Sequence, residues 1–348
     1  MERKSQPLVS IVTPVYNTEK YLAECIESVM AQSYENWEYV IVNNCSTDRS
    51  LEITQHYAQQ DARVRVHNND RFLNQMQNWN HAMLQISPMS KYCKVVHADD
   101  WLFSECITRM VECAEAHPSV GIVSAYRLDE TQVNLDGLPY PSTFIPGREV
   151  CRRTLQDDLY VFGSPTSLLI RSDLIRKREK FYDESTICAD TQVCFDLLQE
   201  SDFGFVHQVL TYTRRHNESL TSLTYRFDTR RLGYFTALIK YGPIYLDSQE
   251  YENLLERTLD SYHCFLARCV FELREKAFWE YHKNGLRNLG CPISSAKLIR
   301  YLLSESLNLK DTYGRMRHGL RHKSRDSQAL DVVLSSIYTR EDSGENDH

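Results

Sequence analysis

The sequence lacks several features that would each assign it to a large class of proteins. No apolar stretch approaches the ~20 residues that span a bilayer, and the polar start, Met1 to Pro7, does not form a signal peptide. No CxxC pair occurs among the eleven cysteines, which disfavours zinc and favours reduced thiols. Acidic residues outnumber basic ones by 47 to 40, so the chain is not built for a nucleic-acid backbone. We therefore expect a cytoplasmic protein without nucleic-acid partners.

Glycine-rich loops that cradle phosphates are also missing. The first apolar run leads into Thr13 to Asn17 (TPVYN), and no GxGxxG follows it, which disfavours dehydrogenase chemistry. A nucleotidyltransferase would want a glycine-rich, basic loop at this place, and the segment is neither glycine-rich nor basic. Nucleotidyl transfer is therefore a weaker alternative for this chain.

The chain does contain a regular alternation of β-type and helical patterns. Helical spacing or helix starts, at 22–30, from 46, at 75–86 and at 104–116, separate β-type runs at 8–12, 39–42, 64–66, 92–97 and 122–123. The alternation predicts an α/β fold, Rossmann-like, with a mostly parallel central sheet and helices on both faces.

The second half of the chain has a different pattern. From about Tyr225 helical spacing takes over, with an apolar stripe from Leu255 to Ala277 and a further helix at Ser295 to Leu307. We therefore expect an α/β domain at 1–224, an α-helical C-terminal region at 225–325, and a tail at 326–348 whose polar end is disordered.

Polar residues follow the first four predicted strands. Parallel sheets bind ligands beyond the carboxyl ends of their strands, where Thr13 to Asn17, Asn43 to Asp48, Asn68 to Arg71 and Asp99-Asp100 would lie. Adjacent carboxylates at the exit of a buried strand repel each other and lose hydration, so we interpret Asp99-Asp100 as a divalent-metal site. The alternative is a helix cap before Trp101.

Taken together, these segments carry a family resemblance. Val9 to Asn17 (VSIVTPVYN), Ser28 to Tyr34 (SVMAQSY), Val42 to Asp48 (VNNCSTD) and Ala98-Asp99-Asp100 resemble, in this order, the inverting nucleotide-sugar glycosyltransferases of family 2, which have the GT-A fold. The resemblance covers roughly residues 7 to 220. It implies a nucleotide-sugar donor and a saccharide or lipid-linked saccharide acceptor.

The resemblance implies donor contacts in the strand-end loops, at Pro14, Tyr16, Asn17, Asn44, Arg71, Asn80 and Asp99. Two departures from the family pattern concern recognition of the nucleobase. Asn43-Asn44 stands where two acidic residues are usual, and Cys45 stands where glycine is common. An amide both accepts and donates, so UDP is the default donor carrier only. Asn17 has an alternative as a turn and helix cap, and Ser46-Thr47-Asp48 is interpreted mainly as a helix cap.

On the metal side, the resemblance implies that Asp100 binds Mn²⁺ or Mg²⁺ directly, with Asp99 toward the ribose or reaching the metal through water. Downstream, His216 is a candidate metal ligand or phosphate contact, and a structural role is its alternative. Arg214 or Arg215 would offset charge on the leaving group.

On the acceptor side, the resemblance implies that Asp190 is the catalytic base. Ala189 departs from the family, which usually has an acidic residue there, and Asp196 is interpreted as solvated or capping in role. The alternative for Asp190 is an ordinary first-turn aspartate that complements the helix dipole. Gly163 to Arg171 resembles the family's acceptor-side loop and strand.

Together these patterns predict a metal-dependent inverting glycosyltransferase that acts in surface polysaccharide or glycoconjugate synthesis. A catalytically silent binding or scaffold protein of the same fold is the alternative. The basic segment 310–325 suggests a peripheral membrane contact through anionic headgroups, against a solvated helix face or tail.

Overall fold

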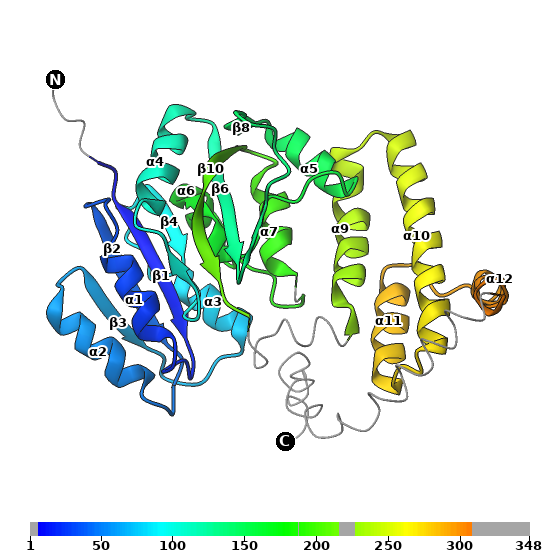
Figure 1. The fold of residues 1–348 in the computed structure, drawn as a ribbon, viewed down its shortest axis with the longest axis horizontal. Coiled ribbons are helices and arrows are strands. Elements are labelled where there is room, and N and C mark those ends of the chain that lie inside the picture. The colour runs from blue at the N-terminus through cyan, green and yellow to red at the C-terminus, as the bar shows by residue number, and fades with distance from the viewer. Residues whose placement is uncertain (1–5, 187, 216–226, 308–348) are drawn as a thin grey trace, which may run out of the picture. The chain divides into compact units, whose positions relative to one another are not determined.

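The computed structural model of the chain describes residues 6–186, 188–215 and 227–307 (Figure 1). The described residues form two compact units. The first lies within Met1–Ser222 and includes Tyr241–Leu246, and the second lies within Leu223–Lys240 and Asp247–His348. The predicted boundary at 224 and the predicted tail at 326–348 stay predictions, since both positions fall outside the described residues.

The first half of the chain alternates strand and helix as its sequence pattern predicts. Its elements are β1 (Val9–Val15), α1 (Leu22–Met30), β2 (Trp37–Asn43), α2 (Ser50–Gln60), β3 (Val64–Asn68), α3 (Gln75–Met83), β4 (Tyr92–Val95), β5 (Trp101–Leu102), α4 (Cys106–Ala116) and β6 (Val120–Asp129). The remaining elements of the first unit are β7 (Gln132–Asn134), β8 (Phe144–Ile145), α5 (Gly147–Leu155), the 3₁₀ turn η1 (Pro165–Ser167), β9 (Leu169–Arg171), α6 (Ser172–Arg176), α7 (Ala189–Leu197) and β10 (Asp202–Thr213).

The strands form one 10-stranded sheet with the order β3-β2-β1-β4-β9-β6-β10-β5, and β7 and β8 pair at its side. Strands β3, β2, β1 and β4 are mutually parallel, as are β6 and β10. Strand β9 lies antiparallel between β4 and β6. The expected mostly parallel α/β sheet is therefore confirmed, with an antiparallel strand inserted at its centre.

The chain leaves β1 toward β2 on one side and later returns to β4 on the other, so the crevice between β1 and β4 is a topological switch point. Pairing of β1 with β2 continues to Val15, whereas pairing with β4 ends at Val12. The carbonyl of Val12 accepts the last bond from Val96, and the next residue facing β4 is Pro14, which has no N–H to donate. Beyond Val12 the two strands can therefore separate, and the loops after them line the opening.

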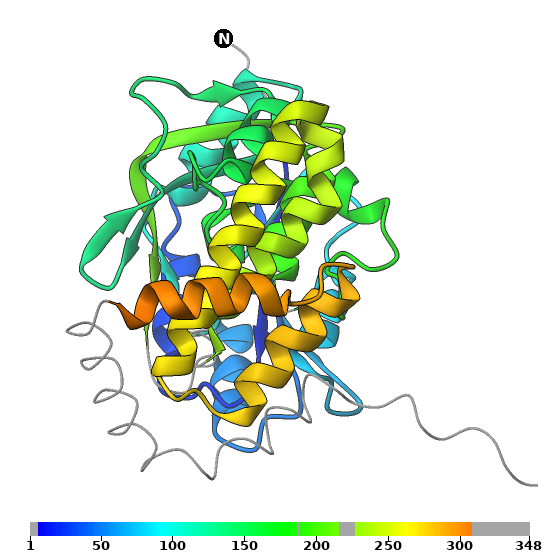
Figure 2. The same ribbon diagram turned by 90° about the vertical axis from the view of Figure 1, so that its right-hand side faces the viewer.

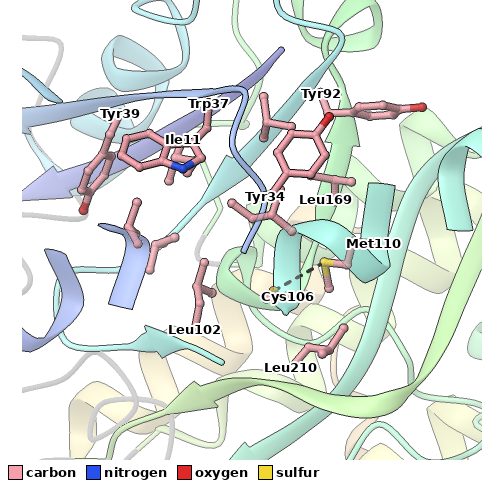
Figure 3. Packing of buried hydrophobic residues seen from close by; sticks show 14 of the residues in the cluster. Ile11, Tyr34, Trp37, Tyr39, Tyr92, Leu102, Cys106, Met110, Leu169 and Leu210 are labelled. Carbon is pink, nitrogen blue, oxygen red and sulfur yellow. Dashed lines mark hydrogen bonds between the residues drawn. The ribbon is translucent and has the colours of Figure 1, made fainter. Parts of the chain in front are cut away.

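A single apolar cluster holds this part of the sheet in place (Figure 3). Alternate residues of β1, Val9, Ile11 and Val15, belong to it together with apolar residues of α1 and α4, and Figure 3 labels Ile11 among them. Tyr39, Tyr92 and Leu210 extend the same cluster along the sheet, and Cys106 contacts Met110 within α4. Because each buried aliphatic side chain contributes about 2 kcal/mol, this packing fixes the strand ends rigidly.

The second unit is helical and contains the first part of α9 (Thr229–Tyr245), α10 (Ser248–Phe271), α11 (Lys276–Asn288) and α12 (Ser295–Ser306). Figure 2 shows α12 crossing α10, on which it packs. Its core gathers Phe235, Tyr262, Leu266 and Phe278 around the buried His282. The expected α-helical C-terminal region is confirmed, including the helix at 295–307.

The spacing of the apolar stripe from Leu255 to Ala277 suggested one helix, but the structure divides this segment. Helix α10 ends at Phe271, and Leu273 adopts a left-handed backbone with φ 55°. The N–H of Leu273 donates to Val270, which closes the helix in the manner of a C-terminal cap. No glycine or proline stands at this turn, so the helical spacing of apolar residues in the sequence continues across it without a break.

Two expectations from composition can be compared with the described chain. All eleven cysteines lie in it as free thiols. Among the described residues, no helix combines the length and the apolar character that crossing a membrane requires.

Candidate active site

The candidate site begins where β4 leaves the sheet. The N–H of Val96 still bonds to β1, and His97 to Asp100 then form a tight turn in which the Asp100 N–H donates to the His97 carbonyl. The chain continues directly into the short strand β5, and α4 begins only at Cys106 without a side-chain cap. Asp99 and Asp100 therefore do not cap a helix, and that alternative was wrong.

The turn brings three possible metal ligands together. One ligand atom each of His97, Asp99 and Asp100 lies within 4.8 Å of the others, and His97 Nδ1 is 3.9 Å from Asp100 Oδ2. Asp100 is only 2% exposed, and its Oδ1 accepts a hydrogen bond of 3.1 Å from the Arg214 backbone N–H. Among the described residues, neither Asp100 Oδ2 nor His97 Nε2 has a hydrogen-bond partner although both are buried. Buried polar atoms are rarely left this way unless something else binds them.

Burial sets the electrostatics of these groups. Loss of hydration, and then the neighbouring charge of Asp99, raises the pKa of Asp100 from 3.8 to about 7. Burial also lowers the pKa of His97, so the imidazole is neutral and has a free lone pair at neutral pH. A neutral imidazole and two carboxylates that gain stability from a cation fit a divalent metal such as Mn²⁺.

Asp190, the predicted base, lies ninety positions further along the chain. It occupies the first turn of α7, and its Oδ1 accepts 2.7 Å from the Thr191 N–H. Asp190 and a protonated His97 interact electrostatically, so the two side chains lie in the same region of the molecule. Burial raises the pKa of Asp190. The carboxylate is thus more basic than a first-turn aspartate in solvent.

Two arginines, Arg214 and Arg215, follow the end of β10. The Arg214 side chain donates from Nε to the Asp99 carbonyl at 3.2 Å and from an Nη to Glu24 at 2.5 Å. Arg215 instead pairs with Asp129, and its N–H donates to Glu130. Of the two arginines proposed to offset leaving-group charge, Arg214 therefore lies at the cluster. The other predicted ligand from this segment, His216, falls outside the described residues.

The loops after β1 and β3 present aromatic rings to solvent. Tyr16 is 45% exposed and Phe72 is 58% exposed, and their ring centroids are 4.9 Å apart in an edge-to-face arrangement. Arg71 beside them is exposed, and Pro14 is half-buried at the opening between β1 and β4. Because the two rings meet edge to face, the exposed face of either ring offers an apolar surface on which a nucleobase can stack.

The side chains of three predicted nucleotide contacts form hydrogen bonds to other parts of the protein. Asn17, with φ 50°, clips the first loop to the second through Thr47, at 2.8 Å from the Thr47 N–H to Asn17 Oδ1. Asn44 is 2% exposed and bonds to the N–H and the carbonyl of Leu73. Asn80 bonds in the same way to both backbone groups of Tyr182, at 2.7 and 2.8 Å. The structure gives these amides the role of joining loops.

The remaining strand-end residues also have structural partners. Asn43 is buried, donates to Asn68 and accepts from the Ser46 N–H. Asp48 accepts from the N–H groups of Ser50 and Glu19, so it ties the start of α2 to the loop before α1, while the N-cap residue of α2 is Arg49 and has no side-chain cap bond. Cys45 adopts φ 57°, a conformation that suits the glycine usual in the family.

Sequence reasoning missed several residues of the site. His97 precedes the aspartates by two and three positions, and this spacing after a strand was the available signal. Trp79 packs on the His97 ring with centroids 4.7 Å apart. Phe72 carries no motif, and Thr166, whose hydroxyl accepts 3.0 Å from the His97 N–H, was only part of the acceptor-side segment from Gly163 to Arg171. They become visible only when β3, β4 and η1 are brought together.

Comparison with curated proteins and solved structures gives consistent results. The family model described as Glycosyl transferase family 2 matches residues 10–178. Glycosyltransferase GlyG of Streptococcus pneumoniae is 31% identical over 197 residues, which cover 52% of this chain and 64% of GlyG. Glycosyltransferase GlyA of the same organism is 29% identical over 127 residues, 36% of this chain and 18% of GlyA. The chain thus matches less than two thirds of either relative's length.

The similar solved structures share the fold along almost the whole chain. S. aureus TarS 1-349 in complex with UDP has a TM-score of 0.58 at 17% identity and covers 92% of both chains. Mannosyltransferase PcManGT from Pyrobaculum calidifontis in complex with GDP-Man and Mn²⁺ has a TM-score of 0.53 at 12% identity, covering 97% of this chain and 89% of its own. The fold is GT-A, and the chain carries, over residues 10–178, a domain of glycosyl transferase family 2.

Proposed function

We propose that this chain is a metal-dependent inverting glycosyltransferase, which moves one sugar from a nucleotide diphosphate sugar to a carbohydrate or lipid-linked saccharide acceptor. The observation that carries the proposal is the convergence of His97, Asp99 and Asp100 within 4.8 Å, with Asp190 close enough to act on His97. Such a transfer requires charge stabilisation on the leaving-group side and a base on the acceptor side. The cluster and the separate carboxylate supply one group for each.

On the leaving-group side, His97, Asp99 and Asp100 would hold Mn²⁺ or Mg²⁺. When bound, the cation neutralises the charge of the departing nucleoside diphosphate. Asp100 is kept in place by the backbone N–H of Arg214, and the Trp79 ring fixes the orientation of the His97 imidazole. The ligands therefore need little rearrangement to bind the cation, which supports tight binding.

On the acceptor side, Asp190 would take the proton from the attacking sugar hydroxyl. A base works best when its pKa approaches the working pH, and burial moves the pKa of Asp190 in that direction. The bond from the Thr191 N–H holds one carboxylate oxygen, so the other oxygen can face the acceptor. Direct displacement at the anomeric carbon, with no intermediate covalent to the protein, then inverts its configuration.

For the donor, we propose a UDP-sugar of the hexose or N-acetylhexosamine type. TarS has been solved with UDP and with UDP-GlcNAc and has TM-scores of 0.58 and 0.59, whereas PcManGT, solved with GDP-Man, has a TM-score of 0.53. In this chain the base would stack on Tyr16 and Phe72, with Arg71 close to them. Synthesis of surface polysaccharide or glycoconjugate fits a saccharide acceptor.

The test is release of nucleoside diphosphate from a panel of UDP-, GDP- and dTDP-sugars in the presence of Mn²⁺. We expect UDP release from at least one donor, and a loss of at least 100-fold for Asp190→Asn with Mn²⁺·UDP binding retained. Asp196→Asn is the matched control, because Asp196 lies on the same helix and bonds to Tyr241 instead. Release that is equally fast in both variants would exclude Asp190 as the base.

The alternatives give different products in the same assay. Release of pyrophosphate would indicate nucleotidyl transfer. Binding of nucleotide sugars with no release of diphosphate, from any donor and with saccharide acceptors present, would indicate a binding or scaffold protein. Full activity after removal of divalent cations with EDTA would contradict the metal-dependent mechanism.

A further inference from the structure

A lysine is buried directly behind the candidate metal ligands. Lys94 lies in β4 between β1 and β9, and none of its surface is exposed. Its ammonium donates to the Thr166 carbonyl at 2.5 Å and contacts the Met110 sulfur at 3.6 Å. An ammonium has three N–H groups, so burial with one oxygen acceptor and one sulfur is costly compared with an apolar side chain. Packing against α4 alone would be served better by leucine or methionine.

The acceptor of that costly bond is itself in contact with the metal ligands. Thr166 lies in η1 and is fully buried. Its hydroxyl oxygen accepts from the His97 N–H at 3.0 Å, and the Asp100 N–H in turn donates to the His97 carbonyl. Thr166 therefore contacts Lys94 through its carbonyl and His97 through its hydroxyl, and the turn from His97 connects it to Asp100.

Thr166 binds the backbone at the point where the pairing between β4 and β1 ends. The N–H of Val96 is the last one after β4 that bonds to β1, through Val12. The next N–H, that of His97, turns to Thr166 instead. The direction in which the turn leaves the sheet, and hence the place where His97 and Asp100 converge, is thus set by a side chain from a distant segment.

We propose that Lys94 and Thr166 are positioning residues for the metal ligands, in which Lys94 fixes η1 and the Thr166 hydroxyl fixes the turn that carries His97 and Asp100. This inference rests on the proposed function of the cluster as a cation site. Groups that orient metal ligands typically change metal affinity by 10- to 100-fold when they are removed.

The experiment measures Mn²⁺ binding in the presence of UDP, from the electron paramagnetic resonance signal of free Mn²⁺, with no turnover required. Thr166→Val removes the hydroxyl at constant shape, Thr166→Ser keeps it, and Lys94→Met removes the ammonium at similar length. The control is Thr54→Val, because Thr54 is equally buried and its hydroxyl bonds only within α2. The melting temperature of each metal-free variant shows whether it is folded.

We expect Thr166→Val and Lys94→Met to weaken Mn²⁺ binding by at least tenfold, and Thr166→Ser and Thr54→Val to stay within threefold of the unchanged protein. Raising the Mn²⁺ concentration should restore diphosphate release by the two weakened variants. Folded Thr166→Val that binds Mn²⁺ normally, or Thr166→Ser as weak as Thr166→Val, would overturn the inference while leaving the proposed function intact. Failure of the unchanged protein to bind Mn²⁺ would overturn both.

Discussion

Replacing Asp100 with asparagine should stabilise the metal-free protein, although it removes the proposed metal ligand. Burial and the charge of Asp99 raise the pKa of Asp100 from 3.8 to about 7, so ionisation disfavours the folded state. The protonated form gives its full contribution to stability below about pH 4, and this is lost as the pH rises toward 7. At 1.36 kcal/mol for each pH unit, the cost of the ionised carboxylate is about 2 kcal/mol at pH 5 and about 4 kcal/mol at pH 8.

The change to asparagine removes this cost and preserves shape. The amide oxygen can still accept the bond from the Arg214 N–H, which is 3.1 Å in length. The amide nitrogen takes the place of Oδ2, which has no partner among the described residues, so its unsatisfied N–H groups offset part of the gain, by about 1–2 kcal/mol. We therefore expect a net gain of about 2–3 kcal/mol at pH 8 and little or none at pH 5.

Urea denaturation of the metal-free protein in EDTA, at pH 5 and at pH 8, measures this difference. In the unchanged protein, Mn²⁺ with UDP should add stability at pH 8, because the cation offsets the carboxylate charges. Asp100→Asn should lose that metal-dependent gain. The reasoning would be refuted if Asp100→Asn were equally destabilised at both pH values, since the raised pKa would then contribute nothing to folding.

Three further predictions concern other parts of the molecule. Phe72→Ala should raise KM for the donor about fivefold with kcat changed less than twofold, because one stacking ring is worth about 1 kcal/mol, and the exposed Met89→Ala serves as control in steady-state kinetics. Asn44→Asp should lower the free energy of unfolding by about 1–3 kcal/mol, because a carboxylate would replace the amide that donates to the Leu73 carbonyl. Asn36→Asp, at an exposed position, is the control and should leave the free energy of unfolding unchanged, so equal urea midpoints for the two variants would contradict this prediction. Leu273→Gly should be more stable than Leu273→Ala by about 1 kcal/mol in the same assay, because only glycine adopts φ 55° without strain.

The sequence predicted the parallel half of the sheet well because each strand there is short, apolar and followed by a helix of regular spacing. The strands β1 to β4 are found within a few residues of the predicted runs. β10, with 12 residues, was not predicted, because polar and apolar residues do not alternate in it regularly. It pairs with β6 through several register shifts, so its place depends on partners that are remote in sequence.

The site was predictable where its chemistry is carried by the turn itself. Asp99 and Asp100 announce a buried acidic pair, and the structure adds His97 from the same turn. Asparagine gives no such signal, because an amide can contact a ligand or bridge two backbone groups equally well. Asn80 faces both backbone groups of Tyr182, a residue more than a hundred positions away, and nothing local reveals that partner.

The two ends of the site differ in how firmly the protein holds them. At the proposed metal end, His97 is held by Thr166 and Trp79 and Asp100 by the backbone N–H of Arg214, so the candidate ligands are held in place by the protein itself. At the end proposed to hold the nucleobase, the amides of Asn43 and Asn44 form hydrogen bonds to protein groups. The groups left to contact the nucleobase are the exposed rings of Tyr16 and Phe72. Stacking discriminates weakly between bases, whereas a hydrogen bond to one ring edge discriminates strongly. Donor selectivity at this site should therefore come from the diphosphate and the sugar more than from the base, so that exchange of uracil for another base lowers affinity by a modest factor.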